Sequence, residues 1–219
     1  METKTVEGKD MIQAKGSTEG LNEVEKVKTE VKEPIGTAVP SEAGKGVYNS
    51  RYKYGYKWDV YAPLGNRVME VMKMVGCDGK KIIDIGCGVG WFTNDIYYNV
   101  SRDVKGIDFA EKAIDHYARL AYPSIEFEVA DVYKYDYTGF EVAVVTEVLE
   151  HLQGDLDLLK RLPKGCKVFA TVPNDHERED FTHVRYYTED SIRERYGDIL
   201  DLKLVSIQGQ SILFWGEIK

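Results

Sequence analysis

Residues 81–93 constrain the fold of this chain more than any other stretch, because a short apolar run leads directly into a glycine-rich loop. Residues 82–85 hold one acid among three isoleucines, a composition typical of a buried strand in a parallel sheet. Gly86, Gly88 and Gly90 follow at alternate positions. Glycines permit positive φ and leave room for a ligand beside the backbone. The stretch therefore predicts a strand, a glycine turn and a helix N-terminus that bind a nucleotide-type group.

The spacing of the glycines and a later acid indicate which kind of nucleotide is bound. A dinucleotide fingerprint requires a glycine where this chain has Trp91, so that motif fits poorly. Asp108 ends the next apolar run, residues 104–107, where a carboxylate can accept hydrogen bonds from both ribose hydroxyls. The pattern resembles motif I of class I S-adenosylmethionine-dependent methyltransferases. An α/β domain with an incidental glycine turn is the alternative that the residues leave open.

Length, charge and cysteine content narrow the class of protein. The chain has 219 residues, which favours one domain, and a net charge of −8, which gives no footprint for non-specific nucleic-acid binding. The three cysteines are odd in number and form no Cys-x-x-Cys pair. With no signal peptide and no long apolar run, the sequence predicts a reduced cytoplasmic protein without a membrane segment.

The first part of the chain divides into two segments of different composition. Residues 1–46 lack aromatic side chains and are rich in Lys, Glu, Thr, Gly and Val, which predicts a disordered tail. Residues 47–61 are rich in tyrosine, with Trp58 and three cations between the rings. These rings fit three roles: covering the sulfonium of a cofactor, packing a helix layer, or stacking on single-stranded RNA. We expect the folded domain to span residues 47–219.

The periodicity of the remaining chain predicts alternating helices and strands. The expected helices are 59–75, 92–100, 111–120, 152–162 and one that begins after Thr188. The further expected strands are 104–107, 125–129, 142–145, 167–172, 202–207 and 211–218. The resemblance implies an α/β fold: a doubly wound, Rossmann-like, seven-stranded sheet, mostly parallel with an antiparallel last strand and helices on both faces.

The same resemblance implies which residues contact the cofactor. An acid after the third strand would accept a hydrogen bond from the adenine amine, and the next backbone N–H would lie at the ring. A turn or helix-cap role for that acid is equally consistent with the sequence. The implied cofactor-binding residues are Asp84, Gly86, Cys87, Gly88, Gly90, Asp108, Phe109, Asp131, Val132 and Glu147. Cys87 is expected to fill space in the loop rather than to act as a nucleophile.

Candidate catalytic residues follow the fourth strand. Glu147, Glu150 and His151 stand at i, i+3 and i+4, so a helical turn would place them on one face. This Glu-x-x-Glu-His element matches one found in many methyltransferases of this class, including the ubiquinone-biosynthesis O-methyltransferases. His151 is the expected general base, with Glu150 and His183 beside it; a structural histidine that packs against the sheet is the alternative.

A divalent metal, Mg²⁺ or Mn²⁺, is a further hypothesis for the same residues. Glu147, Glu150, His151 and His183 together offer carboxylate and imidazole ligands. The element also resembles that of the metal-dependent small-RNA 3′-terminal 2′-O-methyltransferases. The short gap to His183 and the lack of an attached RNA-binding module weigh against the RNA interpretation.

The sequence thus predicts methyl transfer from S-adenosylmethionine to an oxygen, or a nitrogen, of a small-molecule acceptor. The alternatives are a metal-dependent RNA 2′-O-methyltransferase and a cofactor-binding regulatory subunit without catalysis. Neither the acceptor nor the oligomeric state is encoded in a readable motif. The absence of Asn/Asp-Pro-Pro-Tyr/Phe after the fourth strand argues against methylation of exocyclic base amines or glutamine amides.

Overall fold

The computed structural model describes residues 58–174 and 182–219, and all structural statements refer to these ranges. The predicted tail and the tyrosine-rich residues 47–57 lie outside the described residues. The predictions made for them therefore stay predictions.

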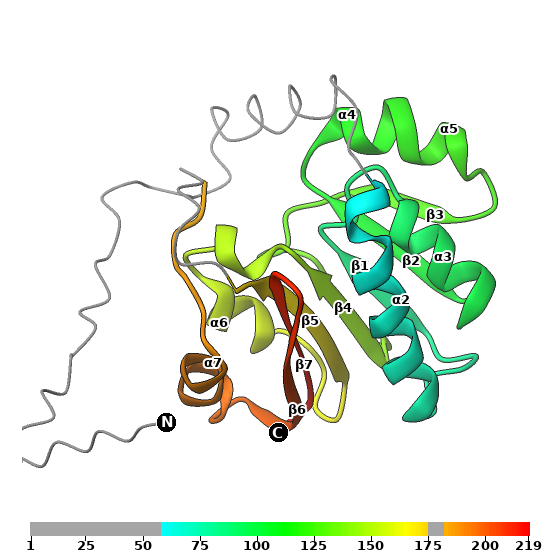
Figure 1. Ribbon diagram of the computed structural model, residues 1–219. Helices are drawn as coiled ribbons and strands as arrows, with labels where there is room; N and C mark the ends of the chain where they lie inside the picture. Colours follow the sequence, from blue (N-terminus) through cyan, green and yellow to red (C-terminus); the bar gives the residue numbers. More distant parts are fainter. Residues whose placement is uncertain (1–57, 175–181) are drawn as a thin grey trace, which may run out of the picture. The chain divides into compact units, whose positions relative to one another are not determined.

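One seven-stranded sheet organises the described residues (Figure 1), with strand order β3-β2-β1-β4-β5-β7-β6. The strands are β1 (Ile82–Ile85), β2 (Val104–Asp108), β3 (Glu126–Val129), β4 (Val142–Thr146), β5 (Lys167–Pro173), β6 (Leu200–Gln208) and β7 (Ser211–Ile218). The first five run parallel, and β7 is antiparallel to both β5 and β6. The predicted fold class, including the antiparallel last strand, is confirmed.

The helices lie on both faces of this sheet (Figure 1). They are α2 (Trp58–Met74), α3 (Trp91–Asn99), α4 (Glu111–Ala113), α5 (Arg119–Ala121), α6 (Asp155–Leu159) and α7 (Glu189–Tyr196). A π-helix, Ile114–Ala118, joins α4 to α5, and a 3-10 helix, Leu149–His151, follows β4.

Alternation along β1 explains the two layers, because successive strand side chains point to opposite faces. Ile82 packs with Met72 of α2 and Ile96 of α3. Ile83 packs on the other face with Leu158 of α6. All four residues of β1 are buried, as expected for a central parallel strand. The strand thus fixes both layers and ends at the glycine loop.

Local sequence signals account for several helix ends. Gly76 follows α2 with φ +76°, a conformation that suits a C-terminal cap. Thr188 caps α7: its hydroxyl accepts from the Ser191 amide at 3.1 Å, and the Thr188 amide donates to Ser191 Oγ at 2.8 Å. The predicted start of a helix after Thr188 is confirmed.

Two helix predictions were wrong in detail. The apolar pattern of 111–120 predicts an inner face made of Ala113, Ile114, Tyr117, Ala118 and Leu120, but Tyr117 and Leu120 are 40% and 73% exposed. Ile114 and Ala118 are buried as that pattern predicts, and the wider π turn accounts for the outward position of the other two side chains. The helix expected over 152–162 is shorter, Asp155–Leu159, because the chain first makes the 3-10 turn and a loop.

Among the described residues, no helix combines the length and the apolar character that crossing a membrane requires.

Candidate active site

The glycine loop joins β1 to α3 in the conformation that the sequence predicts. Gly86, Gly88 and Gly90 have φ values of +76°, +54° and +83°. A Cβ at Gly86 would lie 2.4 Å from Val148 Cγ2, so the segment after β4 packs directly on this loop. The loop and the β4 segment therefore meet at the carboxyl edge of the sheet, where open α/β sheets bind ligands.

Asp108 lies beside the loop at the end of β2. Its Oδ2 accepts a hydrogen bond from the Gly88 amide at 2.9 Å, and its Oδ1 accepts from the Ala110 amide at 2.8 Å. Burial raises the pKa of Asp108 to about 6, against the opposing effect of these amides. Each carboxylate oxygen has a second lone pair, so the side chain retains acceptor capacity for a ribose hydroxyl.

Asp84, within β1, is also buried, and its Oδ2 accepts from Thr93 Oγ1 at 2.6 Å. Burial raises the pKa of Asp84 to about 7; the bond from Thr93 lowers it, and nearby Asp108 raises it further. The carboxyl therefore ties β1 to the first turn of α3. Thr93 was not singled out from the sequence, although its position in the first turn after the loop was visible there.

Cys87 and Asp131 occupy positions that leave their predicted roles untested. Burial raises the pKa of the Cys87 thiol well above its usual range, which suits a space-filling residue. Asp131 follows β3; its Oδ1 accepts from the Tyr133 amide at 2.9 Å and its Oδ2 pairs with Lys134 at 3.2 Å. This is the turn geometry that the sequence offered as the alternative, and the adenine contact stays a prediction.

Glu147 follows β4 in an unusual backbone conformation. Its φ is +54°, and among the described residues no other side-chain-bearing residue has a positive φ. Burial raises the pKa of its carboxyl, opposed by the hydroxyls of Thr171 and Ser211. Among the described residues, its Oε1 has no hydrogen-bond partner. A strained backbone and a buried, incompletely bonded carboxyl are features that concentrate at functional sites.

Glu150, His151 and His183 come together as predicted. One ligand atom from each lies within 4.8 Å of the others. The ring centroids of His151 and His183 are 4.8 Å apart, and His151 Nε2 lies 3.6 Å from Glu150 Oε1. Glu150 is 1% exposed, so this pairing forms at the margin of the core.

Glu147 does not belong to that group of three. The helical turn expected to align it with Glu150 and His151 begins only at Leu149, because Glu147 has left-handed backbone geometry. Its carboxyl instead approaches Thr171 of β5 and Ser211 of β7. The prediction that one face would carry all three residues was therefore wrong.

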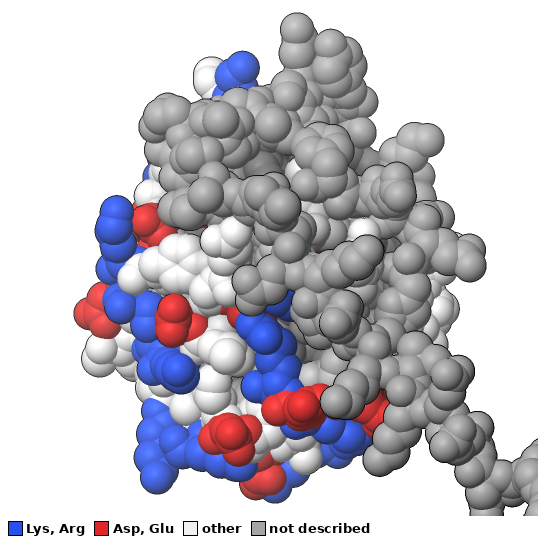
Figure 2. Space-filling view, turned by 90° about the vertical axis from the view of Figure 1, so that its left-hand side faces the viewer, with Lys and Arg blue, Asp and Glu red and all other residues white. Residues whose placement is uncertain are grey.

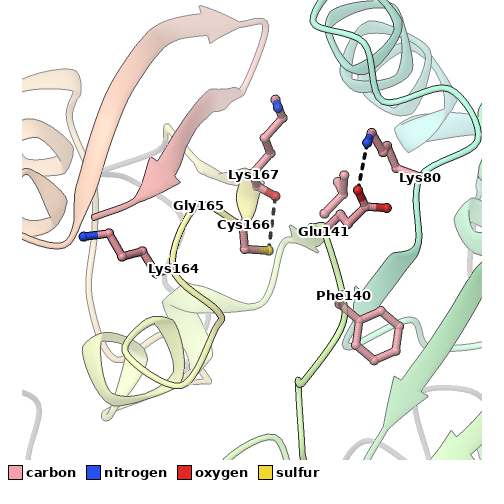
Figure 3. A pocket seen from close by; sticks show the side chains of 8 residues that line it. Lys80, Phe140, Glu141, Lys164, Gly165, Cys166 and Lys167 are labelled. Carbon is pink, nitrogen blue, oxygen red and sulfur yellow. Dashed lines mark hydrogen bonds and ion pairs between the residues drawn. The ribbon is translucent and has the colours of Figure 1, made fainter.

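A separate hollow lies at the amino ends of β4 and β5, the opposite edge of the sheet (Figure 3). Lys80 donates to Glu141 Oε1 at 2.8 Å across its mouth. Parallel sheets bind ligands at the other edge, and these exposed charges pair with each other. We therefore place the candidate site at the glycine loop.

Residues 82–167 match a family model described as "Methyltransferase domain". Phosphoethanolamine N-methyltransferase 3 of Arabidopsis thaliana is 35% identical over 95 residues, which cover 41% of this chain and 19% of that protein. Ubiquinone biosynthesis O-methyltransferase of Neisseria meningitidis is 28% identical over 106 residues, 43% of this chain and 44% of that protein. The matches thus span less than half the length of these relatives.

The fold has solved counterparts. The 1,6-didemethyltoxoflavin-N1-methyltransferase of Burkholderia thailandensis, solved with 1,6-didemethyltoxoflavin and S-adenosylhomocysteine, superposes with a TM-score of 0.66. It is 16% identical, over 80% of this chain and 87% of that one, a likeness that speaks for the fold alone. The chain thus matches a methyltransferase-domain model over residues 82–167, less than half of its length, and shares its fold with a solved methyltransferase.

Proposed function

We propose that this domain transfers a methyl group from S-adenosylmethionine to an oxygen or nitrogen of a small-molecule acceptor. The observation that carries the proposal is the hydrogen bond between the Gly88 amide and Asp108, which unites the glycine loop with the acid after β2. The names of the relatives support the acceptor class, since they refer to phosphoethanolamine and to ubiquinone biosynthesis.

The residues present fit this cofactor at two points. Gly88 carries no Cβ, so the loop backbone can approach the amino-acid part of the cofactor there. Gly86 and Gly90 instead leave room for the side chains of Val148 and Phe127, which pack against the loop. The remaining lone pairs of Asp108 suit the two ribose hydroxyls. When bound, S-adenosylmethionine supplies an electrophilic methyl group on a sulfonium.

The acceptor side requires a base for an alcohol, phenol or amine, and His151 has the geometry of one. Its Nδ1 lies 3.1 Å from the Thr182 carbonyl, which only accepts, so this nitrogen carries the hydrogen in the neutral ring. Nε2 then keeps its lone pair, as a proton acceptor needs. The Glu150 carboxylate at 3.6 Å stabilises the imidazolium that forms. Positioning and exclusion of water supply the rest of the catalysis.

Calorimetric titration with S-adenosylhomocysteine tests the cofactor, and a methyl-transfer assay over catechol, phenol and amine acceptors tests the reaction. We expect micromolar binding, about −8 kcal/mol. His151→Gln should keep that affinity and lose turnover, whereas His116→Gln should keep both. His116 serves as the matched control because it lies in the π-helix, far along the chain from the acceptor-side residues.

The outcomes separate the alternatives. No binding by the wild-type chain would overturn the cofactor assignment. Binding without transfer to any acceptor would favour a regulatory subunit. Normal turnover in His151→Gln would remove this residue as the base.

A second candidate, divalent-metal dependence, is favoured by one observation: Glu150, His151 and His183 offer three ligand atoms within 4.8 Å of one another. These residues would hold Mg²⁺ or Mn²⁺, which would polarise the acceptor oxygen. Calorimetry with Mn²⁺ should then give a heat that His183→Ala removes. Unchanged heats and unchanged activity after chelation would exclude the metal.

The charges on the face of the domain that Figure 2 shows give less support to RNA as the acceptor. Lysine and arginine side chains alternate there with acidic ones among the described residues, without one continuous basic surface. Retention of single-stranded RNA by the purified chain at physiological salt would favour the RNA interpretation.

A further inference from the structure

A group of charges around the buried Asp155, outside the catalytic set, joins the histidine-bearing segment, residues 182–187, to the segment after β4, residues 149–155. Arg185 lies at its centre. Its Nη1 donates to the carbonyls of Leu149, at 3.2 Å, and of Leu152, and its Nη2 donates to that of Gln153 at 3.0 Å. A planar guanidinium with five N–H donors suits several carbonyls in one loop, whereas a lysine ammonium does not.

Asp155 holds this guanidinium in place from α6. Its side chain is fully buried, and its Oδ1 lies 3.2 Å from Arg185 Nη1. Arg195 of α7 binds both oxygens of the same carboxylate at 2.7 Å, and Tyr196 Oη donates to it at 2.6 Å. Buried charges with this many partners are costly to break and keep a defined geometry.

Two hydrogen bonds link the segment that contains Arg185 to the catalytic residues. The Val184 amide donates to the Glu150 carbonyl at 2.7 Å. His151 Nδ1 donates to the Thr182 carbonyl at 3.1 Å. Both partners belong to the chain segment on either side of His183, so the position of that segment decides which ring nitrogen of His151 carries the hydrogen.

We propose that Arg185, held by Asp155, is a positioning residue that sets the ring orientation and tautomer of His151 against Glu150 and His183. The inference rests on the proposed function in taking His151 as the acceptor-side base. The positioning itself is measurable without an acceptor. Arg185 touches neither the cofactor loop nor the reacting atoms, and its effect passes through the Leu149 to Gln153 carbonyls.

If Arg185 had a purely structural role, loss of its guanidinium would leave the tautomer ratio of His151 unchanged. The positioning role predicts a change at His151 in a chain that stays folded. Helix α7 has anchors that do not involve Arg185, because Ile192 and Tyr196 lie in the core. Arg195 of this helix also keeps its two bonds to Asp155, the carboxylate that it shares with Arg185. Loss of the Arg185 guanidinium should therefore leave α7 in place. It should release the Thr182 to Val184 segment and, with it, the hydrogen bond at His151.

The test is ¹⁵N NMR of the imidazole rings in the full chain, which has four histidines. Single His→Gln variants assign the signals. We expect the wild-type His151 ring to favour the Nδ1–H tautomer by about tenfold, the bias that one hydrogen bond supplies. Arg185→Gln should bring the ratio towards a mixture, lower the turnover number and leave the affinity for S-adenosylhomocysteine unchanged.

Arg185→Lys and Arg161→Gln complete the design. The first keeps the charge beside Asp155 and loses the planar fork, so it decides the question if Arg185→Gln does not fold. Arg161 donates to a backbone carbonyl, that of Tyr135 at 2.9 Å, and its loss should leave the His151 signals unchanged.

A wild-type tautomer ratio in a folded Arg185→Lys or Arg185→Gln protein would overturn the positioning role. Failure of the proposed function has another signature: the wild-type chain would lack cofactor binding or methyl transfer while the NMR differences between these variants persisted.

Discussion

The Gly88 amide donates to Oδ2 of Asp108 at 2.9 Å, so the loop after β1 and the acid that ends β2 form one hydrogen-bonded unit. Parallel pairing of the two strands, with Ile85 opposite Ile107, brings the two residues together. A substitution at either residue should therefore disturb this hydrogen bond and shift the position of the other residue.

Asp108→Asn is expected to weaken S-adenosylhomocysteine binding by about 1–3 kcal/mol, because an amide cannot accept from both backbone donors and from the ribose. Calorimetry measures the change. Asp103→Asn, an exposed acid just before β2, should bind as the wild type does. Equal affinities in the two variants would contradict the ribose assignment.

Gly86→Ala should destabilise the fold and the cofactor loop together. Its positive φ alone costs about 1–2 kcal/mol for an alanine, and the new Cβ would lie 2.4 Å from Val148. Gly139→Ala is the matched control, since Gly139 has φ +85° and no neighbour within 4 Å of its added Cβ. Urea unfolding of both variants separates the cost of the positive φ from the cost of the contact with Val148. An identical loss of unfolding free energy in the two variants would show that Val148 moves aside without cost.

Asp84 should make stability depend on pH in a defined direction. Burial raises the pKa of its carboxyl from 3.8 to about 7, so the folded chain binds more protons than the unfolded chain between those values. The stability of the wild type should therefore fall, relative to Asp84→Asn, as the pH rises through that window. Unfolding at about pH 5 and about pH 8 measures the difference. A constant difference would mean that the folded carboxyl titrates normally.

Glu147 offers a direct test of backbone strain. Glu147→Gly and Glu147→Ala remove the same carboxyl, but only glycine adopts a φ of +54° without a steric cost. The glycine variant should be more stable to urea by about 1 kcal/mol. Greater stability of the alanine variant would show that the residue is not held in the left-handed region.

Asp155→Asn should cost about 3–5 kcal/mol of the free energy of unfolding, because it leaves two guanidinium groups without their buried carboxylate. Asp157→Asn, an exposed acid on the same helix, should change stability by less than about 0.5 kcal/mol. Thermal and urea unfolding would measure both. The side chains of Arg185 and Arg195 are 15% and 33% exposed, so a small loss in Asp155→Asn would mean that solvent replaces the carboxylate at both guanidinium groups.

Much of the sheet was predictable because its strands are apolar and short. The structure has a strand at Val142–Thr146 and a turn of positive-φ glycines after Ile85, as the sequence predicts. The apolar periodicity did not predict the π turn at residues 114–118. A π turn holds about one more residue than an α turn, so it changes which side chains face inward, and the sequence pattern does not mark where this happens.

The site was predictable only in part. Glu150, His151 and His183 were named from residue chemistry, and the structure brings them together. Glu147 was wrongly grouped with them, because a left-handed glutamate has no sequence signature. Arg185 and Asp155 were missed, since nothing in a linear sequence distinguishes a buried ion pair from charges on the surface.

The ring of Phe127 in β3 occupies the space that two glycines leave open. An added Cβ at Gly106 or at Gly90 would lie 2.7 Å from this ring. Phe127 lies in the edge strand β3, Gly106 lies in the neighbouring strand β2, and Gly90 ends the glycine loop. The Phe127 ring fills the space beside both glycines. Related chains should accordingly vary the three positions as a set, a side chain at position 106 or 90 appearing together with a smaller residue at 127.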